Sequence, residues 1–305
     1  MVLTGFDRVI MVDWSAGNQR GARPVKDAIW VAAHGHAGAE PPVYLRSRAA
    51  AEQWITRSLE DDIAAGRRVC IGFDFALAYP AGFGRALTGG DDPLAVWDWF
   101  AARVTDGPQA NNRFDLAAAI NRGFGGGGPF WFNGLARDIP DLPRKGTARS
   151  VRWKNPRRAT ELAAKGSFEC WQMGGAGAVG GQIFMGLPVL ARLRRRFGAA
   201  LTVWPFQPPG APVTLIEIWP SLLADVVRAA QAPGEIRDAA QVRVMAAAIA
   251  ALDPGALADL FDHPPDPEGW IFGAGHDTAL RQAARRACGV KACGTKACGM
   301  KERQP

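Results

Sequence analysis

The chain has 305 residues, of which 48% are hydrophobic and 21% are charged. This composition is typical of a globular protein with a sizeable core, and it excludes an intrinsically disordered chain. The formal net charge of +7, from 36 Lys and Arg residues against 29 Asp and Glu residues, suggests a nucleic acid, an anionic lipid surface or a phosphorylated substrate as partner.

The positive charge is concentrated in three segments of the chain. Residues 142–165 carry a net charge of +7, residues 192–196 carry +4 and residues 285–305 carry +5, so the other residues together sum to −9. The sequence therefore describes an acidic body with three basic patches. We expect the last segment, which repeats the triplet Ala-Cys-Gly, to be a solvated low-complexity tail that follows a single domain of residues 1–284.

The N-terminus and the cysteines bear on the compartment. Charged residues occupy the positions where the apolar core of a secretory signal would lie, and five cysteines in a chain of this length do not suggest a disulfide framework. We therefore expect a cytoplasmic protein. The longest uncharged stretch, residues 170–191, contains six glycines and Pro188, which favours a glycine-rich loop and a buried helix over a membrane span.

Hydrophobic periodicity predicts the elements in chain order. In the first part of the chain it predicts strands at 8–14, 27–34 and 43–45, a helix at 47–65 and a strand at 68–75. Further on it predicts helices at 92–104, 113–122 and 188–196, strands at 201–204 and 213–219, and helices at 220–230 and 238–252. The fold class that follows is α/β, with a mixed sheet flanked by helices.

Acidic residues stand at the ends of several predicted elements. Asp13, Asp74 and Glu217 lie at or near the carboxyl ends of three strands, and Asp238 lies at the start of a late helix. Ligands of open α/β sheets gather at the carboxyl ends of the strands. Four converging carboxylates would repel one another unless a divalent cation neutralised them, and oxygen-only ligands suit Mg²⁺ or Mn²⁺. The ordinary alternative is that each acid caps a turn or pairs with a nearby arginine.

The same residues belong to four short motifs whose order carries a resemblance. The motifs are VDWSA at 12–16, IGFDFALAYP at 71–80, IEIWPSLLA at 216–224 and RDAAQVRVMAAAIAAL at 237–252. The order of strands, helix and acids resembles the ribonuclease H-like fold. More narrowly, the motifs are similar to those of a predicted-nuclease family of uncharacterised function with that fold.

The resemblance implies a fold, an activity and a set of site residues. It implies a ribonuclease H-like sheet with a large central insertion at about 91–210, and it makes Asp13, Asp74, Glu217 and Asp238 the catalytic metal ligands. The implied activity is divalent-metal-dependent hydrolysis of phosphodiester bonds in a nucleic acid or nucleotide, with Mg²⁺ or Mn²⁺ as cofactor.

Two alternatives to a nuclease remain open. The family has a second aspartate three positions after the fourth acid, where this chain has Gln241, which supplies no charge to a metal. A catalytically inert nucleic-acid-binding module is therefore one alternative. Chains that resemble this one are also described as molybdopterin guanine dinucleotide synthesis proteins, which makes an accessory or nucleotide-binding factor in that synthesis the other.

A basic stretch supplies candidate residues for substrate binding. Arg152, Trp153, Lys154, Arg157 and Arg158 combine cations with an aromatic ring, as proteins that hold a phosphate backbone and stack a base do. A solvated loop is the alternative for this stretch. We also expect Trp14, next to an acid, to stack on a substrate.

A glycine motif also needs interpretation. Residues 175–180 match G-x-G-x-x-G, but no acid follows at the distance that a dinucleotide site requires. We expect a glycine-rich turn packed against the active cleft.

Overall fold

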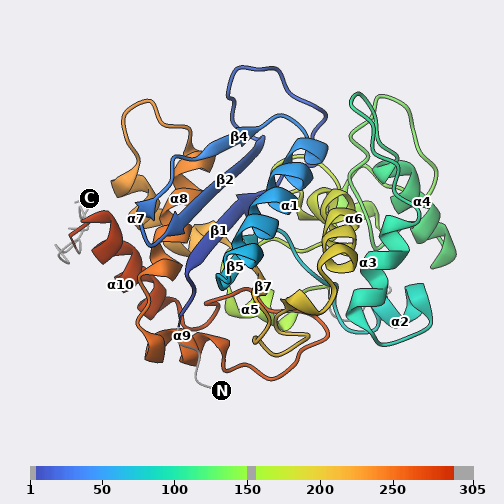
Figure 1. Cartoon of the computed structure of the whole chain (residues 1–305). Helices are drawn as coiled ribbons and strands as arrows, with labels where there is room; N and C mark the ends of the chain where they lie inside the picture. The colour runs from blue at the N-terminus through green and yellow to red at the C-terminus, as the bar shows by residue number, and fades with distance from the viewer. Residues whose placement is uncertain (1–4, 150–155, 292–305) are drawn as a thin grey trace, which may run out of the picture.

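The computed structural model describes residues 5–149 and 156–291, and Figure 1 shows their arrangement as a sheet between two layers of helices. The sheet of this part of the chain has seven strands. They are β1 (Arg8–Asp13), β2 (Ile29–Gly35), β3 (Gly38–Ala39), β4 (Val43–Leu45), β5 (Val69–Phe73), β6 (Leu201–Val203) and β7 (Val213–Glu217). The prediction of a mixed α/β sheet is confirmed.

The strand order determines which ends of the strands meet. The order is β3-β2-β1-β5-β7-β6, and β4 also pairs with β2. β2 runs antiparallel to β1, whereas β1, β5, β7 and β6 are mutually parallel. The carboxyl ends of β1, β5 and β7 therefore lie next to one another at one edge of the sheet.

The helices of the described residues complete the two outer layers. They are α1 (Arg48–Ala64), α2 (Phe83–Thr88), α3 (Pro93–Ala101), α4 (Arg113–Gly123), α5 (Ala159–Ala163), α6 (Val179–Phe197), α7 (Ala224–Ala230), α8 (Arg237–Ala250), α9 (Pro254–Phe261) and α10 (Asp277–Cys288). Short 3₁₀ turns lie at Gly146–Ala148, Gly198–Ala200 and Pro220–Leu223.

Alternation along the strands divides the core into two parts. Ile10 and Val12 of β1 belong to the cluster that contains residues of α1 and α6, whereas Val9 and Met11 belong to the cluster with α8. The strands are apolar on both faces because helices cover both. Each side chain at a strand end therefore goes either to the α6 face or to the α8 face of the sheet.

α6 packs closely on the strand ends because of its glycines. A Cβ atom at Gly180 would lie 2.7 Å from the carbonyl oxygen of Cys170, and one at Gly186 would overlap with the ring of Phe75. Only glycine allows the backbone of a helix to approach so near. The close packing positions α6 directly behind the residue that follows Asp74.

Several boundaries differ from the predictions. The helix predicted at 188–196 begins at Val179, since its glycines pack instead of breaking the helix. α10 extends past residue 285, where we expected the tail to begin, because Arg285 forms an ion pair with Asp225. The central region at about 91–210 contributes α6 to one face of the sheet and β6 to its edge.

No single helix among the described residues is both long and apolar enough to cross a membrane. α8 and α9 pass that test of length and composition only when taken together, and they are bent by 109° at the break between them.

Candidate functional site

Asp13 and Asp74 lie side by side at the carboxyl ends of two neighbouring parallel strands. Val12 of β1 is in register with Phe73 of β5, and an aspartate follows each of these two residues, Asp13 in one strand and Asp74 after the other. The amide of Asp74 donates to the carbonyl oxygen of Val12 at 3.2 Å, and the amide of Trp14 donates to Oδ1 of Asp74 at 2.7 Å. The carboxyl group of Asp74 also lies near enough to that of Asp13 to raise the pKa of Asp13.

The surroundings of this pair favour its protonated form. Each residue keeps part of its surface accessible, while the protein removes most of the water from the carboxyl groups. Burial raises the pKa of Asp74 to about 7. The pKa of Asp13 lies well above its ordinary value, first because of burial and then because of the charges of Asp74 and Asp238. Two buried carboxylates that lie close together repel each other unless one of them is protonated or a cation is bound.

Asp238 reaches the same place from the first turn of α8. Its Oδ2 accepts a hydrogen bond of 2.7 Å from the amide of Asp27, in the loop between β1 and β2. Burial is the main cause that raises the pKa of Asp238, and the charge of Asp27 adds to it. The structure thus brings together three of the four acids that the sequence singled out, on the α8 face of the sheet.

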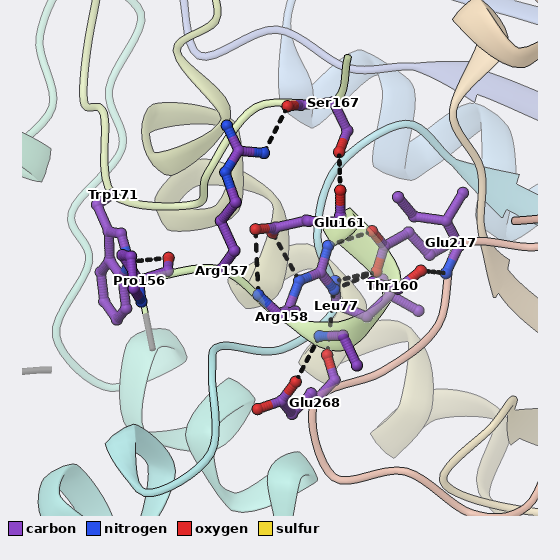
Figure 2. Close-up of polar contacts among 12 residues, drawn as sticks. Leu77, Pro156, Arg157, Arg158, Thr160, Glu161, Ser167, Trp171, Glu217 and Glu268 are labelled. Atoms are coloured by element: carbon purple, nitrogen blue, oxygen red, sulfur yellow. Dashed lines mark hydrogen bonds and ion pairs between the residues drawn. The ribbon is translucent and has the colours of Figure 1, made fainter. Parts of the chain in front are cut away.

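Glu217, the fourth acid, points to the other face. Val213 and Leu215 of β7 belong to the cluster on the α6 face, and alternation sends Glu217 the same way. Its side chain accepts two hydrogen bonds from Arg158, of 2.6 and 2.8 Å, and one of 3.0 Å from the amide of Leu77 (Figure 2). With both oxygens engaged, Glu217 does not join the other three acids.

Arg158 is the centre of a buried network and does not lie on the surface where we expected it. It is 1% exposed. Besides Glu217 it binds Oε1 of Glu161 at 2.8 Å and the carbonyl oxygen of Glu268 at 3.1 Å (Figure 2). The Glu268 carboxylate in turn accepts the amide of Ala159 at 2.8 Å. The expectation that Arg158 contacts phosphate is corrected, because its cation is neutralised by two buried carboxylates.

The other predicted substrate residues have mixed positions. Trp14 is 1% exposed and packs its ring against Phe73 and Phe75, so it is a core residue that no substrate reaches. Arg157 is half-buried and donates to the carbonyl oxygen of Ser167 at 2.9 Å. The remaining three, Arg152, Trp153 and Lys154, lie outside the described residues.

A small cavity opens at the ends of β5 and β7. It has a volume of about 40 Å³, and Asp74, Glu217 and Trp219 are among its lining residues. Phe168, which is 52% exposed, lies on the same wall. Asp74 and Glu217, whose side chains leave the sheet on opposite faces, thus both line this cavity. The sequence did not single out Glu161, Glu268 or Phe168, and the partners of Glu268 are distant in the chain.

The glycine motif serves packing. Gly175 and Gly177 both adopt a φ of +78°, which side chains rarely tolerate, and they form the turn before α6. Gly180 allows the first turn of α6 to lie against the carbonyl groups of Cys170 and Gln172. This agrees with the expectation of a turn packed near the cleft.

The donor set fits a cation held by two carboxylates better than one held by four. In residues 5–149 and 156–291, no group of three or more His, Cys, Asp and Glu side chains is arranged to hold a metal ion. Asp13 and Asp74 nevertheless lie on neighbouring strand ends and interact strongly enough to raise the pKa of Asp13, and Mg²⁺ is commonly held by one or two carboxylates together with water. Asp238 adds negative charge beside them. No family model matches the chain, and neither a curated protein nor a solved structure matches it.

Proposed function

We propose that this protein has a ribonuclease H-like fold and hydrolyses phosphodiester bonds in a nucleic acid or nucleotide with Mg²⁺ or Mn²⁺. The observation that carries the proposal is the approach of Asp13, Asp74 and Asp238 from three elements that are distant in sequence. Burial and mutual repulsion raise the pKa of Asp13 in particular. Clusters of acids with raised pKa values are characteristic of catalytic and metal-binding sites.

The topology supports the fold part of the proposal. β2 is antiparallel to β1 on one side, and β5 is parallel to β1 on the other, after a crossover through α1. The carboxyl ends of β1 and β5 therefore place Asp13 and Asp74 next to each other. The order of the last two strands in the sheet is the reverse of their order in the chain: β7 pairs with β5, and β6, which precedes β7 in the chain, forms the edge of the sheet.

The proposed roles follow from the contacts of the three acids. Asp13 and Asp74 would hold the cation through their carboxylates in the deprotonated form. A divalent cation at this position supplies Lewis-acid activation of a water molecule and stabilises charge on the phosphate. Asp238 holds the loop between β1 and β2 through the amide of Asp27, and so keeps that loop beside the reacting group.

Glu217 and Gln241 have different roles from those that the resemblance implies. Glu217 maintains the buried pair with Arg158 and forms part of the cavity wall next to Asp74. Gln241 lies one turn after Asp238 on α8 and leaves the acid cluster one carboxylate short. We therefore propose that two carboxylates, Asp13 and Asp74, carry the metal.

A combined metal-binding and cleavage experiment tests the function. Mn²⁺ binding is measured by isothermal titration calorimetry, and cleavage is measured on single- and double-stranded DNA and RNA. We expect the wild type to bind Mn²⁺ and cleave, and Asp13→Asn to lose both. Asp61→Asn, which removes an exposed carboxylate of α1, is the matched control and should behave as the wild type does.

Each other outcome rejects the proposal in a specific way. A protein that neither binds Mn²⁺ nor is stabilised by it has no metal site at Asp13 and Asp74. Metal binding without cleavage of any substrate points to the accessory or nucleotide-binding factor. Binding of nucleic acid that is independent of Mn²⁺, without cleavage, points to the inert binding module.

A further inference from the structure

A second cavity lies at the start of α1. It has a volume of about 100 Å³, several times what a single water molecule needs. Three arginines, Arg20, Arg46 and Arg48, line it together with Ser15, Ser47 and one acid, Asp106. These residues come from the loop after β1, from the turn between β4 and α1, and from the first position of α1. The sequence did not single them out because these arginines are separated by other residues in two short segments.

One of the three arginines is already neutralised. Arg48 is 6% exposed, and its Nε donates to Oδ2 of Asp106 at 2.7 Å. Its Nη1 also donates to the carbonyl oxygen of Ser15 at 3.0 Å. Arg48 therefore fixes the loop after β1 in place, and it forms a rigid wall of the cavity.

The other two arginines are held together without an acid. The amide of Arg20 donates to the carbonyl oxygen of Arg46 at 2.8 Å, and Nε of Arg46 donates to the carbonyl oxygen of Arg20 at 3.2 Å. Within residues 5–149 and 156–291, neither guanidinium forms an ion pair with a carboxylate. Both guanidinium groups belong to exposed residues that line one cavity, where a bound anion would neutralise them.

One residue joins this cavity to the acid cluster. The carbonyl oxygen of Asp27 accepts hydrogen bonds from Oγ of Ser15 at 3.0 Å and from Nη2 of Arg20 at 3.2 Å. The amide of the same Asp27 donates to Asp238 at 2.7 Å. The cation-lined cavity and the acids that would hold a metal therefore lie on the two sides of a single peptide segment.

We propose that the cavity between Arg20 and Arg46 binds a backbone phosphate of a nucleic acid strand, next to the phosphodiester that reaches Asp13 and Asp74. The inference rests on the proposed function, since it assigns the substrate-holding part of the same site. Arginine suits this task because its planar guanidinium donates two parallel hydrogen bonds to phosphate oxygens. A strand bound in this way spans from the cationic cavity to the acids.

Binding of a labelled oligonucleotide tests the proposal. The probe is a short fluorescein-labelled oligothymidylate, followed by anisotropy in EDTA so that no cleavage occurs. The variants are the double substitution Arg20→Gln with Arg46→Gln, and the matched control Arg23→Gln with Arg57→Gln. The control removes two exposed arginines that do not line the cavity, so both proteins lose the same net charge. Thermal unfolding of both variants verifies that they fold.

We expect the cavity variant to bind the oligonucleotide about tenfold more weakly and the control variant to change less than twofold. The dependence of log K on log salt should become shallower by about one to two in the cavity variant, because two phosphate contacts are lost. Equal losses in both double variants, or no binding by the wild type, would overturn the proposal. Binding of inorganic phosphate is measured as well. If the cavity variant loses inorganic phosphate but binds the oligonucleotide as the wild type does, the proposal is also overturned.

Mn²⁺ titration separates this inference from the function on which it rests. If the cavity variant loses the oligonucleotide but binds Mn²⁺ as the wild type does, both stand. If Mn²⁺ does not bind to the wild type, the proposed hydrolysis fails, while selective loss of the oligonucleotide in the cavity variant still supports the phosphate cavity.

Discussion

The carboxylates of Asp74 and Glu217 leave the sheet from opposite faces, although both stand at the ends of neighbouring strands. The register of β5 and β7 pairs Phe73, and not Asp74, with Glu217. Side chains that are paired in register point to the same face. Glu217 therefore follows Phe73 to the α6 face, where Arg158 meets it, and Asp74 goes to the α8 face with Asp13.

The pair of Arg158 and Glu217 predicts a large effect on stability. Arg158→Met leaves Glu161 and Glu217 buried without a cation, so the free energy of unfolding should fall by about 3–5 kcal/mol. Urea denaturation followed by circular dichroism measures it. Arg157→Met removes a single contact with a carbonyl oxygen and should lower the free energy of unfolding by about 1 kcal/mol. Equal effects of the two variants would contradict the network.

The raised pKa of Asp74 predicts a pH dependence of stability. The folded state keeps a proton on this group up to a pH of about 7, whereas the unfolded chain releases it near its ordinary value of 3.8. The folded state thus binds more protons between these values, and the free energy of unfolding should decrease as the pH rises through this window, by up to about 4 kcal/mol from this group. Urea unfolding over this pH range measures it.

Removal of one acid should flatten that profile. Asp13→Asn removes a carboxyl group whose pKa is raised by burial and by the charges of Asp74 and Asp238, so this variant should be more stable than the wild type at pH 8 by about 1–3 kcal/mol. Asp61→Asn should keep the wild-type profile. A destabilised Asp13→Asn at pH 8 would argue against repulsion within the pair.

Metal addition and removal should reproduce the same competition. Because protons and cations compete for Asp13 and Asp74, Mn²⁺ should raise the melting temperature more at pH 8 than at pH 5. At a hundredfold excess over Kd, the stabilisation should reach about 2.7 kcal/mol, and EDTA should reverse it. Differential scanning fluorimetry measures the shift. An equal shift at both pH values would place the bound ion elsewhere.

The close approach of α6 to Phe75 predicts that Gly186→Ala destabilises the protein. The added Cβ overlaps with the ring of Phe75, which has no room to retreat in the core, so we expect a loss of about 1–3 kcal/mol. Gly123→Ala is the control. It lies in α4, where a Cβ meets nothing within 4 Å, and it should be neutral or slightly stabilising. Urea denaturation of both variants decides.

Part of the fold follows directly from the sequence. The apolar runs that form β1 and β5 are short, continuous and followed by an acid, so both strands and the meeting of Asp13 with Asp74 could be predicted. The face to which Glu217 points could not. Its strand, Val213–Glu217, is buried on both faces, so it carries no alternation of polar and apolar residues from which to read a face.

The role of Arg158 was also beyond the sequence. A run of arginines has the same sequence pattern whether it is solvated or buried, and its acidic partners determine which of the two occurs. Those partners, Glu217 and Glu268, stand 59 and 110 positions further along the chain. Glu161, three positions away, is the one local sign that a capping pair with Arg158 begins a helix.

The Arg158 network has a consequence for how the chain is synthesised. Its guanidinium and Glu161 come early, but they are not fully partnered until Glu217 and then Glu268 have been added. A fragment that ends before residue 217 would bury a cation with a single carboxylate. We therefore expect the region around α5 to complete its folding only after Glu268 has been synthesised, and we expect a cut between α5 and β7 to leave two fragments that do not fold alone.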